Sequence, residues 1–198
     1  MITKVVAIVG SYRKGGTIDQ AVEAVLEGAR AKGAVTQTIR LTERQIEFCT
    51  NCRQCMQAPG EERGRCAQHD EMEPILAGIE AADAVVLGSP VNAFNTTAIF
   101  RRFMERLVGY GYWPWGQNAP VARTKRRPRK AVLVASSAAP GFLIPLATGA
   151  PRALSLAATL LGAKPVGKLW IGFAAREKHQ QLPDKTRERA RRLGLKLA

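Results

Sequence analysis

The stretch KVVAIVGSYRKGGT, residues 4–17, decides the fold of this chain. Residues 4–10 are mostly β-branched and almost wholly apolar, which predicts a strand buried on both faces of a sheet. The glycine-rich remainder leads into a helical stripe of apolar residues over 18–32, and a second strand is expected at 35–41. A strand, a helix and a second strand in this order form a βαβ unit, whose two strands lie parallel.

The same alternation continues to the end of the chain. It predicts strands at 84–88, 131–136 and 166–173, and helices after Asp70 and at 96–108, 150–161 and 184–197. Residues 110–128 are aromatic, basic and interrupted by Gly and Pro, so we expect a loop there. Five strands with helices between them predict an α/β fold in which helices cover both faces of a parallel sheet. We expect a single domain over 1–198, with a cysteine-rich insertion at about 47–69 and a basic C-terminal helix at about 184–197.

Composition narrows the class of protein. The 198 residues include 30 Lys and Arg against 16 Asp and Glu, and 46% of the chain is hydrophobic, which argues against disorder. No apolar run approaches the roughly 18 residues of a membrane span. The N-terminal apolar run is too short for a signal peptide, so we expect a cytoplasmic protein with no membrane segment. Residues 100–198 hold 20 basic and 4 acidic residues, so the excess charge belongs to the second half.

Three loops of unusual composition follow predicted strands. Residues 10–17 combine glycines, the hydroxyls of Ser11 and Thr17, the Arg13 guanidinium and a helix N-terminus, which favours phosphate binding over an ordinary turn. This loop is neither a GxGxxG motif nor a Walker P-loop. Residues 88–96 and 136–141 follow the third and fourth strands. Ligands of open α/β sheets bind at the carboxyl ends of the strands, so the three loops together could hold a flat, phosphorylated cofactor.

At this point the sequence resembles a known family. The segments GSYRKGGT, GSPVNAFNTTAIFRRFMERL and FCTNCRQC…RCAQHDEM are similar to the NAD(P)H-dependent FMN reductase superfamily of flavodoxin-like proteins, over residues 3–141. More narrowly, they resemble its iron–sulfur flavoprotein branch. The resemblance implies a five-stranded sheet of order 2-1-3-4-5, a non-covalently bound FMN at its carboxyl edge, and a homodimer or homotetramer.

The resemblance also assigns positions to the flavin. It places the phosphate on Ser11, Arg13, Gly16 and Thr17, the isoalloxazine against Pro90, Val91, Asn92 and Phe94, and the other side of the ring against Ser137, Ala139 and Gly141. Asn92 departs from the pattern, because relatives usually carry Tyr after the SPV sequence. Phe94, or an aromatic side chain of another subunit, could then stack on the ring.

All four cysteines fall within 18 residues, in the pattern Cys-x₂-Cys-x₂-Cys-x₁₀-Cys. In a reducing compartment such a cluster indicates metal or redox chemistry rather than disulfides, and an iron–sulfur cluster, a zinc ion and free redox-sensing thiols are all compatible with it. The resemblance implies a [4Fe–4S] cluster on Cys49, Cys52, Cys55 and Cys66. The last gap in that branch is shorter, about 4–7 residues, but a longer loop adds little closure entropy.

The implied function is an FMN-dependent oxidoreductase that passes electrons from NAD(P)H to a small acceptor such as a quinone or a flavin, or to a ferredoxin-like redox protein. The flavin carries the reactivity, so we predict no catalytic side chain. The sequence shows no nucleophile elbow, no HExxH motif and no paired-carboxylate signal, and we expect His69 to be a surface residue. The alternative is a flavodoxin-like module without turnover that senses redox state or binds nucleic acid or another partner.

Two basic runs have several possible uses. Residues 123–130 include six basic residues, and residues 176–196 include eight basic and three acidic ones. They could bind a polyanion, attract FMN and the NADPH phosphate, or form a solvated face. The absence of a helix–turn–helix, zinc-finger or RRM pattern speaks against nucleic acid as the partner.

Overall fold

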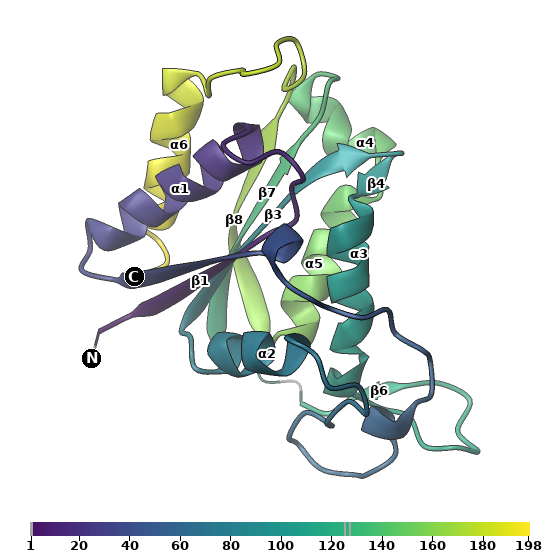
Figure 1. Cartoon of the computed structure of the whole chain (residues 1–198). Coiled ribbons are helices and arrows are strands. Elements are labelled where there is room, and N and C mark those ends of the chain that lie inside the picture. The colour runs from purple at the N-terminus through teal and green to yellow at the C-terminus, as the bar shows by residue number, and fades with distance from the viewer. Residues whose placement is uncertain (1, 125, 127) are drawn as a thin grey trace.

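The protein is described by a computed structural model that places residues 2–124, 126 and 128–198. Its main sheet has five parallel strands in the order β2-β1-β3-β7-β8 (Figure 1). These strands are β1 (Lys4–Val9), β2 (Val35–Arg40), β3 (Ala84–Asn92), β7 (Arg129–Ser136) and β8 (Ala163–Ile171). The α/β fold and the 2-1-3-4-5 order expected from the sequence are therefore confirmed.

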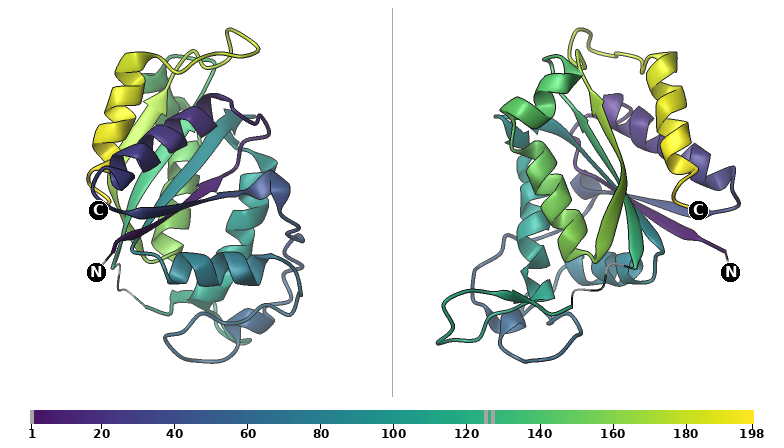
Figure 2. Two further views of the ribbon diagram at one scale, coloured as in Figure 1. Left: turned by 60° about the vertical axis from the view of Figure 1, so that its left-hand side comes forward. Right: turned by 180° about the vertical axis from the view of Figure 1, so that it is seen from behind.

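Helices cover both faces of the sheet (Figure 2). One face carries α1 (Thr17–Arg30) and α6 (Asp184–Gly194), and the other carries α2 (Met72–Glu80), α3 (Ala98–Glu105) and α5 (Ala150–Leu160). The short elements are η1 (Leu41–Glu43), η2 (Gln54–Met56), η3 (Arg106–Tyr110), η4 (Gly141–Leu143) and α4 (Ile144–Ala147).

The apolar run of β1 is explained by these two layers. Val5, Ala7 and Val9 pack toward α1 and α6, whereas Val6 and Ile8 pack toward the opposite helices. Side chains alternate along a strand, so a strand covered on both faces needs apolar residues at every position. For this reason the apolar run at residues 4–10 could predict a strand that is buried on both faces of the sheet.

Several predicted boundaries were wrong. The strand predicted at 84–88 continues to Asn92, because its ladder with β7 extends to the pairs Ser89–Ala135 and Pro90–Ser136. The loop predicted at 110–128 contains a small hairpin of β5 (Gly111–Tyr112) and β6 (Val121–Ala122), and positions 125 and 127 of the basic run lie outside the described residues. A further short strand, β4 (Asn95–Thr96), turns back on the end of β3.

No single helix in the described part of the chain has the length and apolar content needed to cross a membrane. One bent pair, Gly141–Ala147 with Ala150–Leu160, reaches that length and composition when its members are counted together across a bend of 75°.

Helices α1 and α6 approach so closely that their backbones touch. A Cβ atom on Gly28 would lie 2.0 Å from the carbonyl oxygen of Arg191, and one on Gly194 would lie 1.9 Å from that of Val25. Real Cβ atoms do not make such contacts, so these two glycines set the distance between the helices. The Arg191 guanidinium, 2.7 Å from the Glu27 carboxylate, closes the edge of the same contact.

We expect Gly28→Ala to lower the free energy of unfolding by about 1–3 kcal/mol, because the added methyl group overpacks the α1–α6 contact. Gly78→Ala is the matched control: Gly78 is also inside a helix, but nothing lies within 4 Å of a Cβ added there. That control should gain up to about 1 kcal/mol from helix propensity alone. Urea unfolding measures both, and equal effects of the two substitutions would contradict the packing argument.

Candidate functional site

A large hollow lies at the carboxyl edge of the sheet, with a volume of about 780 Å³. Its walls come from segments 11–18, 90–92 and 136–138, which follow or end β1, β3 and β7, and from a fourth segment at 174–181. The structure thus brings the three predicted loops together at one site. The predicted flavin residues that line the hollow are Ser11, Arg13, Gly16, Thr17, Pro90, Val91, Asn92 and Ser137.

The first loop folds over the N-terminus of α1. The Ser11 hydroxyl accepts a hydrogen bond from the Arg13 N–H at 3.2 Å, and Gly15 has a left-handed φ of 72° that turns the chain into the helix. Gly16 is the N-cap and has no side chain to accept hydrogen bonds from the first turn of α1. The N–H groups of that turn are therefore open to an anion in the hollow.

Asp19, in the first turn of α1, holds this loop in place. The Asp19 carboxylate accepts a hydrogen bond from the Gly15 N–H and pairs with the Arg40 guanidinium. Burial raises the pKa of Asp19 above its ordinary value, and the guanidinium opposes that shift. The carboxylate holds Gly15 in place, and Arg40 balances its charge.

The second loop turns sharply where β3 passes into β4. Ala93 and Phe94 both have positive φ, 43° and 60°, and form the tight turn between β3 and β4. Phe94 is 75% exposed, and it is not among the described residues that line the hollow. Contact of Phe94 with a flavin ring stays a prediction.

The third loop touches the hollow only at its beginning. The Ala139 carbonyl accepts hydrogen bonds from the Ser137 hydroxyl at 2.9 Å and from the Phe173 N–H at 3.1 Å. Gly141 packs against the end of β8, where an added Cβ would lie 2.8 Å from the Trp170 carbonyl oxygen. Neither Ala139 nor Gly141 belongs to the described lining of the hollow, so their direct contact with a flavin also stays a prediction.

Sequence reasoning missed the fourth wall, residues 174–181. Gln180 ties this segment down by donating to the Phe173 carbonyl at 2.8 Å and accepting from the Arg176 N–H at 3.1 Å. Gln20 of α1 donates to the Gln180 carbonyl at 3.0 Å. The segment carries no motif, and the signal that could have found it is its place directly after the fifth strand.

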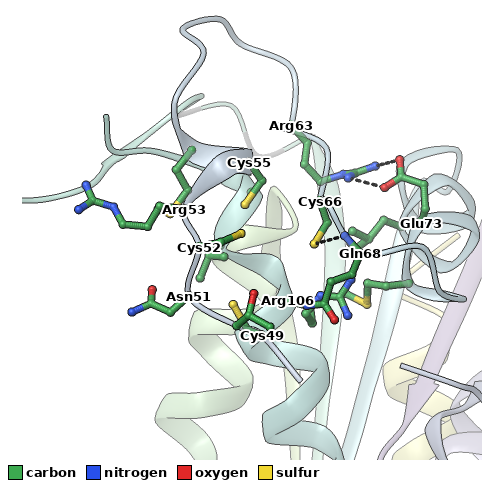
Figure 3. A pocket seen from close by; sticks show the side chains of 17 residues that line it. Cys49, Asn51, Cys52, Arg53, Cys55, Arg63, Cys66, Gln68, Glu73 and Arg106 are labelled. Atoms are coloured by element: carbon green, nitrogen blue, oxygen red, sulfur yellow. Dashed lines mark hydrogen bonds and ion pairs between the residues drawn. The ribbon is translucent and has the colours of Figure 1, made fainter. Parts of the chain in front are cut away.

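The four cysteines line a second, much smaller cavity of about 30 Å³. They are free thiols, and Figure 3 shows Cys66 facing Cys49, Cys52 and Cys55 across one shared space. The ten residues before Cys66 therefore do not carry it away from the other three. This cavity shares no described lining residue with the large hollow, and the cysteine segment lies toward the opposite end of α3 in Figure 1.

The backbone around Cys52 favours its thiolate. Asn51 and Arg53 both have positive φ, 55° and 58°, so the chain winds tightly around the cysteine between them. A hydrogen bond from the Gln54 backbone N–H lowers the pKa of Cys52. Burial raises the pKa of Cys55, and the neighbouring thiols add to that rise. Within the described residues, no three Cys, His, Asp or Glu side chains are spaced to bind one metal ion.

A buried ion pair joins both ends of the cysteine segment to the core. The side chains of Arg106 and Asp70 are 1% and 5% exposed, and their closest atoms are 2.5 Å apart. Arg106 also donates to the Glu47 carbonyl at 2.8 Å, and Asp70 accepts from the backbone N–H groups of Glu47 and Met72 at 2.8 and 2.9 Å. Glu47 precedes Cys49 and Asp70 follows Cys66, so one ion pair fixes where the segment leaves and rejoins the fold.

The sequence model of the NADPH-dependent FMN reductase family matches residues 3–141, a region that includes three of the four walls of the hollow and all four cysteines. The chain belongs to this family. The chain also resembles an iron–sulfur flavoprotein of Archaeoglobus fulgidus, with 33% identity over 111 residues, 56% of this chain and 48% of that protein. The chain spans about half the length of the curated relatives it matches.

Solved structures show the same fold. An FMN-dependent NADH-azoreductase from Bacillus anthracis in complex with FMN superposes with a TM-score of 0.70 and 13% identity, covering 98% of this chain and 99% of that one. An archaeal flavodoxin superposes with a TM-score of 0.57 and 13% identity, covering 99% and 96%. At these identities the likeness establishes the flavodoxin-like fold of this FMN reductase family member.

We expect Asp70→Asn to lower the free energy of unfolding at pH 7 by about 3–5 kcal/mol, because it leaves the buried Arg106 guanidinium without its partner. Burial raises the pKa of Asp70, but the hydrogen bonds from Arg106 and from the backbone N–H groups of Glu47 and Met72 outweigh it, so the pKa lies below the ordinary 3.8. The stabilisation is therefore present above pH 3.8 and is lost as the pH falls through the lower folded-state value.

Denaturant titrations from pH 7 to pH 3 should show the difference between the natural protein and Asp70→Asn shrinking only at the acid end. Asp184→Asn, in the exposed first turn of α6, serves as the control and should differ little from the natural protein. A gap of the same size at every pH would show that Asp70 is not a stabilising carboxylate.

Proposed function

We propose that this chain is an FMN-dependent oxidoreductase that draws electrons from NAD(P)H and passes them to a small acceptor such as a quinone or a flavin. The observation that carries the proposal is the hollow at the carboxyl edge of the sheet, built from loops that follow four of the five strands. Its volume of about 780 Å³ lies within the range of about 300–1,000 Å³ typical of cofactor pockets. Membership of the FMN reductase family supports the same cofactor.

The phosphate end of the hollow is defined by α1. The Ser11 and Thr17 hydroxyls, the Arg13 guanidinium and the N–H groups after Gly16 would surround a phosphate dianion, and the helix dipole adds attraction. These residues come from one continuous loop, so the phosphate would fix the register of the whole cofactor.

The ring end lies between the second and third loops. Pro90–Asn92 and Ser137 line the hollow from the ends of β3 and β7, which are neighbours in the sheet. Bound FMN would supply the chemistry by exchanging a hydride with nicotinamide and passing electrons on. The protein's task is to hold the ring, to offer N–H groups to it, and to leave one side open to the donor and then the acceptor.

The charged fourth wall suits the electron donor. Lys178 and His179 line the hollow from segment 174–181, and Arg13 and Lys14 line it from the first loop. Basic groups from these two segments would attract the phosphates of NAD(P)H.

The cysteine segment fits a [4Fe–4S] cluster held by Cys49, Cys52, Cys55 and Cys66. All four donors are thiols, which suit iron–sulfur clusters, and they surround one shared space. In such a cluster each thiolate binds a different iron, so the sulfur atoms are spread more widely than the ligands of a single ion. A bound cluster would transfer single electrons, so the partner could be a ferredoxin-like redox protein as well as a small molecule.

The proposal further includes a single flavodoxin-like domain over residues 1–198 that assembles as a homodimer or homotetramer. Three large apolar side chains near the carboxyl edge remain exposed, namely Phe94 at 75%, Phe142 at 69% and Leu146 at 78%. Apolar side chains left in solvent at one edge favour association with another subunit.

A charge placed in the phosphate site tests the flavin assignment. Thr17→Asp should weaken FMN binding at least about tenfold, because it puts a carboxylate where the phosphate would lie. Thr186→Asp, in the first turn of α6 and outside the lining of the hollow, should bind FMN normally. Quenching of FMN fluorescence on titration measures both affinities. A colourless natural protein that fails to bind added FMN would refute the proposed function.

Loss of one thiol tests the cluster assignment. After anaerobic purification, Cys66→Ser should contain at least about tenfold less iron and acid-labile sulfide than the natural protein, while FMN content stays the same. His69→Ala changes the exposed neighbour of the same loop and should keep both the metal and the flavin. Natural protein that retains FMN but holds neither iron nor sulfide would show that these are free, redox-active thiols instead.

A further inference from the structure

Arg123 begins the basic run at 123–130, and no part of the proposed chemistry uses it. Its half-buried guanidinium donates hydrogen bonds to four backbone carbonyls: those of Cys55 at 3.1 Å, Ala58 at 2.9 Å, Gly60 at 3.1 Å and Gly109 at 2.9 Å. Three of the four acceptors lie in or at the start of the long gap between Cys55 and Cys66. The guanidinium therefore binds three carbonyls from the first half of that gap, which draws residues 55–60 together around one planar group.

The second half of the gap, which leads to Cys66, contacts Gly109 as well. The Gly64 N–H donates to the Gly109 carbonyl at 3.0 Å, so Gly109 holds both Gly64 and Arg123. A Cβ atom on Gly64 would lie 1.7 Å from the Cys55 carbonyl oxygen, which means that the backbones of residues 55 and 64 are in direct contact. Cys66 follows two residues later, so this contact returns the fourth cysteine to the first three.

Arg123 is itself held by the small hairpin. Its backbone N–H donates to the Tyr110 carbonyl at 3.1 Å, and its guanidinium lies 5.8 Å from the centre of the Tyr112 ring. The hairpin strands β5 and β6 pair through Gly111 with Ala122 and Tyr112 with Val121, immediately before Arg123. Arg123 is thus held by contacts with η3 and β5, while its guanidinium binds the cysteine segment.

The chemistry of arginine suits this task. A guanidinium carries five N–H donors in a rigid plane and so can serve several carbonyls at once, whereas a lysine ammonium is a point charge on a flexible stem. Residues 57–65 belong to no helix or strand, so their carbonyls have no regular ladder to join. Arg123 supplies donors to two of these carbonyls, those of Ala58 and Gly60.

We infer that Arg123 is a positioning residue that fixes Cys55 and Cys66 relative to each other across the ten-residue gap. It lets a gap longer than that of related motifs deliver a fourth ligand to the same centre. This inference rests on the proposed cluster for its consequence, but the placement of the two thiols is a property of the protein alone.

The first experiment follows iron in the anaerobically purified full-length protein. Arg123→Met should lose iron to a chelator at least about tenfold faster than the natural protein, Arg123→Lys should fall between, and FMN content should not change. Arg129→Met is the matched control, because Arg129 is also half-buried and donates to four carbonyls, those of Ile79, Glu80, Ala82 and Leu161, away from the cysteines. Equal iron loss in Arg129→Met, or none in Arg123→Met, would overturn the inference.

The second experiment needs no cluster. In a Cys49→Ser, Cys52→Ser background, a short bis-maleimide should join Cys55 to Cys66 in most molecules, and adding Arg123→Met should reduce that cross-link several-fold while Arg129→Met leaves it unchanged. If the natural protein holds no iron but this difference appears, the cluster proposal fails and the positioning role stands. A cross-link of equal yield in all three proteins would overturn the role of Arg123 whether or not iron is present.

Discussion

The parallel direction of the five main strands is the constraint on which the rest of the structure depends. Parallel strands all end at the same edge, and their register decides how closely the following loops approach. Val9 pairs with Gly88 and Pro90 pairs with Ser136, so the ends of β1, β3 and β7 are nearly level. The Gly10 N–H then donates to the Gly88 carbonyl at 2.8 Å, which continues the ladder into the first loop. The large hollow is a consequence of this pairing.

The sequence could predict this part because it follows from local pattern. The apolar run of residues 4–10 reports burial on both faces, and the glycines and hydroxyls after it report a loop at a strand end. The strand ends were harder, since Pro90 suggested a break whereas pairing with β7 carried β3 to Asn92. The turn at residues 93–94 was also hidden from the sequence, because composition alone does not report the positive φ of Ala93 and Phe94.

The position of Cys66 in the cysteine segment depends on contacts between residues that are distant in the sequence. The cysteine spacing predicted a shared centre for the first three thiols, but nothing in the spacing says where Cys66 must lie after a ten-residue gap. The structure settles its place through groups distant in sequence: Arg106 and Asp70 at the base, and the contact of Gly64 with Cys55 and Gly109 near the tip. Such long-range polar contacts leave no periodic trace, so this placement could not be predicted from the sequence.

The contacts of individual arginines explain part of the net charge of +14. Two arginines of the basic second half work inside the fold, since Arg123 and Arg129 bind backbone carbonyls. Arg53, from the first half, lies over the rings of Trp113 and Trp115, 3.8 and 4.2 Å from their centres. Carbonyls and aromatic rings do not neutralise a guanidinium, so Arg53, Arg123 and Arg129 keep their positive charge within these contacts. Through Arg123, part of the basic excess of the second half thus orders the backbone of the cysteine segment encoded in the first half.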